Sequence, residues 1–198
     1  MFDTLLPLLL FVLVATISPG GATTLATASG ANFGWRRSLP LLSGISFGLA
    51  TMAAAAAAGL GSIILAMPSL QLAMKLVGSV YLLWLALQIA RRGAPAGMAA
   101  GTEKPSRFFT GAGLLWQNPK AWAMTLSAAA SFASLTQSPE TLALLLGLVF
   151  GVSSMISLAI WCIAGLVLAH ALSTDRQWRI LNISLGGLLV TSIVPIWI

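Results

Sequence analysis

The sequence predicts an all-α membrane protein with six transmembrane helices, arranged as two three-helix repeats of opposite orientation. Of its 198 residues, 58% are hydrophobic and only 7% are charged, and the mean hydropathy is +0.96. A soluble domain carries about a quarter charged residues, so this composition excludes a water-soluble protein. Two apolar stretches, in matching places of the two halves, are interrupted by helix-breaking residues, and this pairing predicts the repeat.

Long stretches without Asp, Glu, Lys or Arg give the individual helices, since each span needs roughly 20 apolar residues. We expect helices near residues 4–26, 39–66, 70–90, 108–133, 141–170 and 180–198. The connection at 93–107 is rich in Gly, Ala and Pro and separates a first repeat (1–92) from a second (108–198). Because three spans is an odd number, the second repeat starts from the opposite side. We therefore expect one transporter domain over 1–198, with a pseudo-two-fold axis in the membrane plane.

The basic residues are concentrated in three connections that this topology places on one side of the membrane. They are Arg36 and Arg37; Arg91, Arg92, Lys104 and Arg107; and Arg176 and Arg179. The positive-inside rule predicts that these connections face the cytoplasm and that both termini lie outside. A net charge of +6 divided in this way excludes a nucleic-acid-binding face.

Small residues are frequent in the predicted helices and permit close helix packing. The clearest patterns are Gly44-x3-Gly48, Gly147-x3-Gly151 and the alanine run 53–58. Packing within one chain is the favoured interpretation, and a homo-oligomer is the alternative. The single cysteine, Cys162, excludes an internal disulfide and a thiol-redox carrier.

The first interruption is Ser18-Pro19-Gly20-Gly21, in the first span of the first repeat. Proline removes a backbone donor and clashes with the preceding turn, and glycine permits strained dihedral angles. The chain after the break, Ala22-Thr23-Thr24, would then begin a new half-helix whose free N–H groups attract a carboxylate. The alternative is a simple proline kink in a membrane helix.

The second interruption is Asn118-Pro119-Lys120, in the first span of the second repeat. Lys120 lies about 18 Å into its span, at about 1.5 Å per residue, within a hydrocarbon core about 30 Å thick. A lysine at that depth marks a functional site that faces the bundle interior. The alternative is that Lys120 caps carbonyls freed by the broken helix.

Two further candidates lie in the third span. Lys75 is near the outer end, where it could bind substrate or anchor the helix at the membrane interface. The Tyr81 hydroxyl needs a polar partner and could line a cavity.

The placement of the carboxylates bears on the substrate. All four lie in connections or at span ends, at Asp3, Glu103, Glu140 and Asp175. This disfavours a metal-ion or polyamine substrate and favours an anionic or zwitterionic one.

These motifs resemble the lysine-exporter superfamily, in its homoserine/threonine-exporter branch. Ser18-Pro19-Gly20 matches the family's Ser/Thr-Pro-Gly-Pro-Asn element, although Gly21 and Ala22 replace the final Pro and Asn. The family's third-span and fourth-span patterns are met by Lys75, Gly78, Tyr81 and Leu82, and by Asn118, Pro119 and Lys120. Gly30-x3-Gly34, Trp35-Arg36-Arg37, Ser43-Gly44-x3-Gly48 and Arg179-x-Leu181-Asn182-Ile183 look like the cysteine and O-acetylserine exporters within that branch.

The resemblance implies export of amino acids or their derivatives across the bacterial inner membrane, driven by the proton motive force and without a cofactor. Since the membrane holds no carboxylate to pair a cationic side chain, we expect a small neutral substrate such as cysteine, O-acetylserine, homoserine or threonine. The expected site residues are Ser18, Pro19, Gly20, Gly21, Thr23, Lys75, Tyr81, Asn118, Pro119 and Lys120.

Two other classes of protein have to be weighed against a transporter. A non-transporting membrane scaffold would give Lys120 no role. An intramembrane serine protease would need a Ser/His dyad, and the nearest match is Thr27-Ala28-Ser29-Gly30 with His170 at the end of the fifth span. We expect the protein not to be an enzyme.

Overall fold

The computed structural model describes residues 2–59, 67–91, 107–191 and 193–197, and the regular elements in these ranges are all helical. This confirms the all-α prediction for the described part of the chain. The predicted connection at 93–107, apart from residue 107, lies outside the described residues, as does the end of the expected 39–66 helix.

The helices follow the predicted spans, with breaks at both predicted interruptions. The first half contains α1 (Phe2–Ile17), α2 (Gly21–Ala57) and α4 (Pro68–Ala90). The second half contains α5 (Phe108–Trp116), α6 (Pro119–Ser131), the 3-10 turn η1 (Ala133–Leu135), α7 (Pro139–His170), α8 (Asp175–Thr191) and α9 (Val194–Trp197). The last expected span is thus divided, because Pro195 has no N–H to donate to the Thr191 carbonyl.

Helix α2 is two antiparallel arms joined at Gly34, whose φ of 75° and ψ of 175° are not helical. A φ in this region favours glycine over residues with a Cβ. The Ser29 and Ser38 hydroxyls hydrogen bond at 2.7 Å, whereas nine residues of straight helix would span about 13.5 Å, so the chain reverses here. We call residues 21–33 and 35–57 the first and second arms of α2.

This reversal replaces the connection that the sequence predicted after the first span. That connection was expected to contain Arg36 and Arg37, but both begin the second arm as exposed helical residues. The first span accordingly runs to residue 33 rather than 26. A single glycine completes the turn, so no loop is needed.

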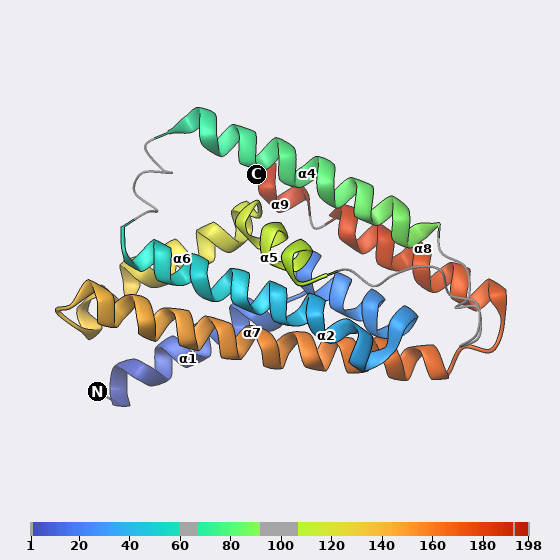
Figure 1. Ribbon diagram of the computed structural model, residues 1–198, viewed down its shortest axis with the longest axis horizontal. Helices are drawn as coiled ribbons and strands as arrows, with labels where there is room; N and C mark the ends of the chain where they lie inside the picture. Colours follow the sequence, from blue (N-terminus) through green and yellow to red (C-terminus); the bar gives the residue numbers. More distant parts are fainter. Residues whose placement is uncertain (1, 60–66, 92–106, 192, 198) are drawn as a thin grey trace.

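The chain runs back and forth along the long axis of the molecule (Figure 1). The reversal in α2, the end of α4 and the α7–α8 connection gather at the right-hand end of the view. The N-terminus, the end of α2, the start of α4 and the α6–α7 connection lie at the opposite end. The reversal in α2, the end of α4 and the start of α8 are therefore at one end, and they carry the basic residues Arg36, Arg37, Arg91, Arg176 and Arg179.

Glycines bring three pairs of helices into backbone contact, as is usual in membrane bundles. A Cβ added to any of them would collide with the carbonyl of the facing helix. The facing pairs are Gly30 with Cys162, Gly165 with Thr27, Gly44 with Phe108, Gly48 with Ala112, Gly111 with Leu41, and Gly186 with Ala86. The first arm of α2 thus packs on α7, the second arm on α5, and α4 on α8.

Large apolar side chains cover the outside of the bundle, as lipid contact requires. On α7 one exposed stripe recurs every three or four residues over the whole helix, at Leu144, Leu148, Val152, Ile156, Ile160, Ile163 and Val167. Among the described residues, α7 and the kinked α2 meet a length and hydropathy test for membrane spans, and shorter apolar helices cover Leu5–Ile17 and Lys75–Ala90.

Candidate substrate-binding site

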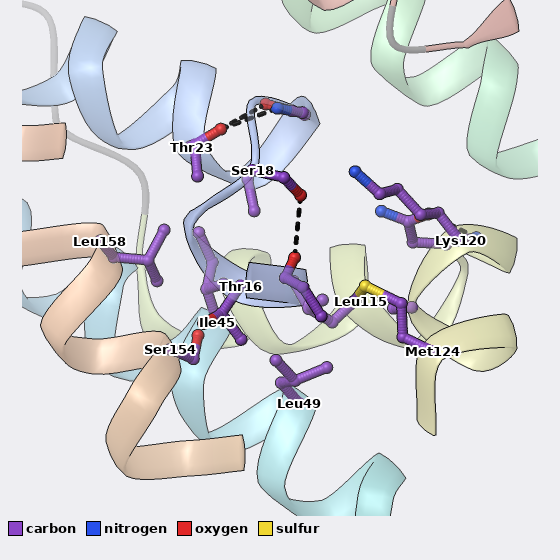
Figure 2. A pocket seen from close by; sticks show the side chains of 16 residues that line it. Thr16, Ser18, Thr23, Ile45, Leu49, Leu115, Lys120, Met124, Ser154 and Leu158 are labelled. Carbon is purple, nitrogen blue, oxygen red and sulfur yellow. Dashed lines mark hydrogen bonds between the residues drawn. The ribbon is translucent and has the colours of Figure 1, made fainter. Parts of the chain in front are cut away.

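Both helix breaks line one cavity in the middle of the bundle, with a volume of about 50 Å³ (Figure 2). Such a space is large enough to hold water. The first break contributes Ser18, Gly20, Gly21 and Thr23, and the second contributes Asn118 and Lys120. The remaining wall includes Thr16, Ile45, Leu49, Leu115, Met124, Ser154 and Leu158.

At the first break, α1 ends at Ile17 and α2 begins after Gly20. The Thr23 hydroxyl accepts a hydrogen bond from the Gly20 N–H at 2.8 Å and donates one to the Gly20 carbonyl at 3.0 Å. Gly20 has no side chain to cap the helix. Among the described residues, we find no partner for the N–H groups of Gly21, Ala22 and Thr23. The positive end of a half-helix therefore begins at the cavity.

Helix α7 satisfies the carbonyls that this break frees at the end of α1. The Ser157 hydroxyl donates to the Thr16 carbonyl at 2.8 Å, and Trp161 Nε1 donates to the Ile17 carbonyl at 3.1 Å. In an apolar environment such groups need a partner, and a neighbouring helix is the usual source. The sequence analysis did not identify these two structural contacts, because no local pattern connects residue 157 with residue 16.

At the second break, Asn118 caps α6, since its Oδ1 accepts from the Lys120 N–H at 3.0 Å. The Trp122 Nε1 donates to the Trp116 carbonyl at 3.0 Å and closes the end of α5. Gly78 of α4 lies against this break, because a Cβ there would be 2.6 Å from the Gln117 carbonyl oxygen. Pro119 is the first residue of α6, where its missing N–H costs nothing.

Lys120 connects the two breaks. Its Nζ lies 3.5 Å from the Pro19 carbonyl oxygen, and a Cβ added to Gly20 would be 3.3 Å from the same Nζ. No carboxylate pairs with Lys120 in the described part of the chain. The ammonium group and the free end of α2 are both positive and lie on the same cavity. This arrangement favours a negatively charged group between them.

Lys75 and Tyr81, the third-span candidates, do not line this cavity. Lys75 Nζ lies 5.9 Å from the centre of the Trp197 ring, and Tyr81 stacks on Trp84 with ring centres 5.7 Å apart. Trp197 also donates to the Ser79 hydroxyl at 3.0 Å. Lys75 is therefore in contact with the C-terminal helix α9.

Ser154 is a polar wall residue that the sequence analysis did not identify. It is 4% exposed and its hydroxyl lies 3.5 Å from that of Ser46 on the second arm of α2. A signal existed in the sequence, because three serines, at 153, 154 and 157, interrupt an otherwise apolar helix. Which of them faces inward could not be decided without the packing of α7.

The described residues do not bring together the groups that a serine protease or a metal site would need. Ser29 is hydrogen bonded to Ser38, and His170 is exposed with its ring nitrogen 2.7 Å from the Leu166 carbonyl, so the two do not form a dyad. The described residues contain no cluster of three or more His, Cys, Asp or Glu side chains that could hold a metal ion.

The family model described as "LysE type translocator" matches residues 13–192 of the chain. A cysteine/O-acetylserine efflux protein of Salmonella typhimurium is 30% identical over 193 residues, which cover 94% of each chain. A protein of the same name from Klebsiella pneumoniae is 30% identical over 190 residues, covering 95% of this chain and 94% of the relative. No solved structure matches the chain.

Proposed function

The chain belongs to the family of LysE type translocators, and on this basis we propose that it exports a small neutral amino acid or amino acid derivative from the cytoplasm. The protein is a membrane transporter and not an enzyme. One observation supports the assignment of substrate binding to this cavity: the two helix breaks, far apart in the sequence, meet at a single site that is lined by the half-buried Lys120. Broken helices of this kind form the substrate sites of secondary transporters.

The proposed architecture is the 3+3 inverted repeat, with spans that include residues 2–33, 35–57, 68–90, 108–131, 139–170 and 175–197. The glycine contacts support it, because a two-fold axis that exchanges the repeats must convert one helix pair into another. The first span packs on the fifth, the fourth packs on the second, and the third packs on the sixth. These pairs map onto one another when spans 1, 2 and 3 are exchanged for 4, 5 and 6.

The substrate carboxylate would bind between the Lys120 ammonium and the free N–H groups of Gly21, Ala22 and Thr23. Charge-assisted hydrogen bonds of this type are about twice as strong as neutral ones. The amino group and a hydroxyl or thiol would face the polar wall of Ser18, Asn118 and Ser154. A cationic side chain would find no carboxylate here, at a cost of several kcal/mol in an apolar site.

Cysteine and O-acetylserine are the first substrates to test, since the relatives are named for their efflux. We propose that the proton motive force drives export across the bacterial inner membrane, with the basic connections in the cytoplasm. The roles of Lys75 and Tyr81 as site residues remain predictions. Both lie on α4, the helix whose Gly78 packs against the second break, and this places them on an element next to the proposed site.

The deciding experiment measures efflux of radiolabelled amino acids from preloaded vesicles that contain the purified protein. The panel contains cysteine, O-acetylserine, homoserine, threonine, lysine and arginine. We expect efflux of one or more neutral compounds that a protonophore abolishes. Lysine or arginine efflux that equals the neutral rates would refute the assignment of a neutral substrate, and no efflux of any compound would favour a scaffold.

A further inference from the structure

The substrate cavity has two chemically different ends. Figure 2 shows Thr23 and Lys120, which belong to the two helix breaks, at the upper end of the cavity. Leu49, Met124 and Ser154 line the lower end. The upper end carries the positive charge described above. The lower end is mainly apolar, and Ser154 supplies a hydroxyl to it.

Helix α6 connects the two ends. Met124 follows Lys120 by four residues, so both side chains lie on the same face of the helix. Four residues correspond to about 6 Å along the helix axis. An amino acid whose carboxylate binds at Lys120 can therefore place its side chain beside Met124.

Helix α7 places Ser154 at the same lower end. The Ser157 hydroxyl bonds the Thr16 carbonyl. Trp161, further along α7, bonds the carbonyl of Ile17, so α1 and α7 run in the same direction here. Ser154 precedes Ser157 by three residues and hence lies on the side away from the first break, about 4.5 Å along the helix. Both helices thus place a wall residue about one turn from a break.

The Ser154 hydroxyl has a proton for which the described structure offers no acceptor. Three other buried hydroxyls of the bundle donate to the carbonyl four residues earlier, those of Thr27, Ser38 and Thr125. Ser154 instead accepts a bond from the Ser46 hydroxyl at 3.5 Å, and no bond that it donates is found among the described residues. Its side chain is buried. A buried donor of this kind calls for water or a ligand as its partner.

We propose that Ser154 selects the side chain of the substrate, by donating a hydrogen bond to an oxygen atom of an uncharged side chain. This inference rests on the export function proposed above and adds the chemical class of the exported compounds. Hydroxyl and ester carbonyl oxygens are good acceptors, whereas a thiol sulfur is a weak one. A purely apolar side chain would displace water from Ser154 without replacing its hydrogen bond, which lowers affinity. The protein would therefore export O-acetylserine and homoserine in preference to cysteine.

The first test compares homoserine with norvaline, which has a methyl group in place of the hydroxyl and nearly the same size. At equal, low concentrations in preloaded vesicles, we expect homoserine efflux to be about three- to tenfold faster, as one hydrogen bond between neutral groups predicts. O-acetylserine should likewise leave faster than cysteine. Both ratios are measured on the original protein and need no variant.

The second test removes the hydroxyl. Ser154→Ala should slow homoserine efflux to the norvaline rate, so that the preference disappears. The variant should fold, because Ser46 also contacts the Met155 sulfur, at 3.7 Å, and keeps a partner. The matched control is Ser153→Ala, at the neighbouring position on α7, which does not line the cavity. This variant should keep the homoserine preference of the original protein.

The outcomes separate this inference from the export function. Equal efflux of homoserine and norvaline by the original protein would refute it, and so would cysteine efflux that is faster than O-acetylserine efflux. A Ser154→Ala protein that keeps the homoserine preference, or that loses both rates in equal proportion, would also refute it. In each of these cases the export of neutral amino acids stands. If the original protein exports none of the compounds, the export function falls and the role of Ser154 falls with it.

Discussion

Lys120 is held at the cavity by uncharged groups of the two breaks, and no carboxylate in the described residues pairs with it. Its Nζ contacts the Pro19 carbonyl, and its backbone N–H donates to the Asn118 side chain. The two sequence-based interpretations, a substrate ligand and a cap for freed carbonyls, are therefore compatible. The 3.5 Å contact to Pro19 is long for a charge-assisted bond, so a substrate carboxylate can replace it without a large loss.

We expect Lys120→Ala to abolish efflux, because the substrate carboxylate then loses the ammonium group proposed to bind it. Lys75→Ala should reduce efflux less, since Lys75 contacts Trp197 and does not line the cavity. The measurement is the initial efflux rate in vesicles, normalised to the amount of inserted protein. A fully active and correctly inserted Lys120→Ala protein would contradict the assignment.

The hydroxyl of Ser157 has a structural task at the first break. Ser157→Ala would leave the Thr16 carbonyl without its partner, and we expect the free energy of unfolding to fall by about 1–3 kcal/mol. Ser153→Ala, one turn earlier on α7, is the control, because no hydrogen bond of the Ser153 hydroxyl is found in the described structure. Thermal unfolding in detergent gives both values, and equal stabilities of the two variants would exclude the capping role.

At the scale of elements, glycine position decides how closely two helices approach. In α5, a Cβ on Gly111 would meet the Leu41 carbonyl at 2.6 Å, whereas a Cβ on Gly113 would meet nothing within 4 Å. We therefore expect Gly111→Ala to lower the melting temperature. Gly113→Ala should be neutral or stabilising, by up to about 1 kcal/mol from helix propensity. The two substituted positions are only two residues apart on the same helix. Equal melting temperatures of the two variants would contradict the packing of α5 on α2.

The breaks could be predicted from sequence because Pro19, Gly20 and Pro119 act on their own backbone. The reversal at Gly34 was read as a longer connection, because Arg36 and Arg37 are typical of a polar loop. In the structure Arg36 and Arg37 are helical, because Gly34 alone, with its positive φ, completes the turn and the second arm begins directly after it. The partners of the broken ends, Ser157 and Trp161, lie about 140 residues away in sequence and leave no local signal.

For the whole molecule, the all-helical fold and the approximate positions of the helices could be predicted from the sequence, but the packing of the helices could not. In a soluble helix the apolar stripe identifies the buried face. In this bundle both faces of α7 are apolar, with Leu146 buried and Leu144 and Leu148 exposed. The hydrophobic periodicity of a helix therefore does not distinguish its lipid-facing side from its inward-facing side. For this reason the cavity wall at Ile45, Leu49 and Leu158 could not be deduced from the sequence.

The topology can be tested with reporter tags. We expect a tag at Gly97, in the 93–107 connection, to report the cytoplasm and a tag after Ile198 to report the external side. The reason is that the basic connections share one end and an odd number of spans separates the two positions. Reporters with activity restricted to one compartment give the answer, and two tags on the same side would exclude the six-span repeat.

The Gly34 reversal also constrains how the molecule can move. The two arms of α2 are joined by one residue and by the Ser29–Ser38 hydrogen bond. Because this connection is so short, the arms move together as one rigid hairpin. Any rearrangement that opens the cavity must leave this hairpin intact. Since α1 is tied to α7 through Ser157 and Trp161, and the first arm of α2 packs on α7 through Gly30 and Gly165, these helices would move together as one unit. The alternation between inward and outward access would then be a movement of this unit against α6, which carries Lys120.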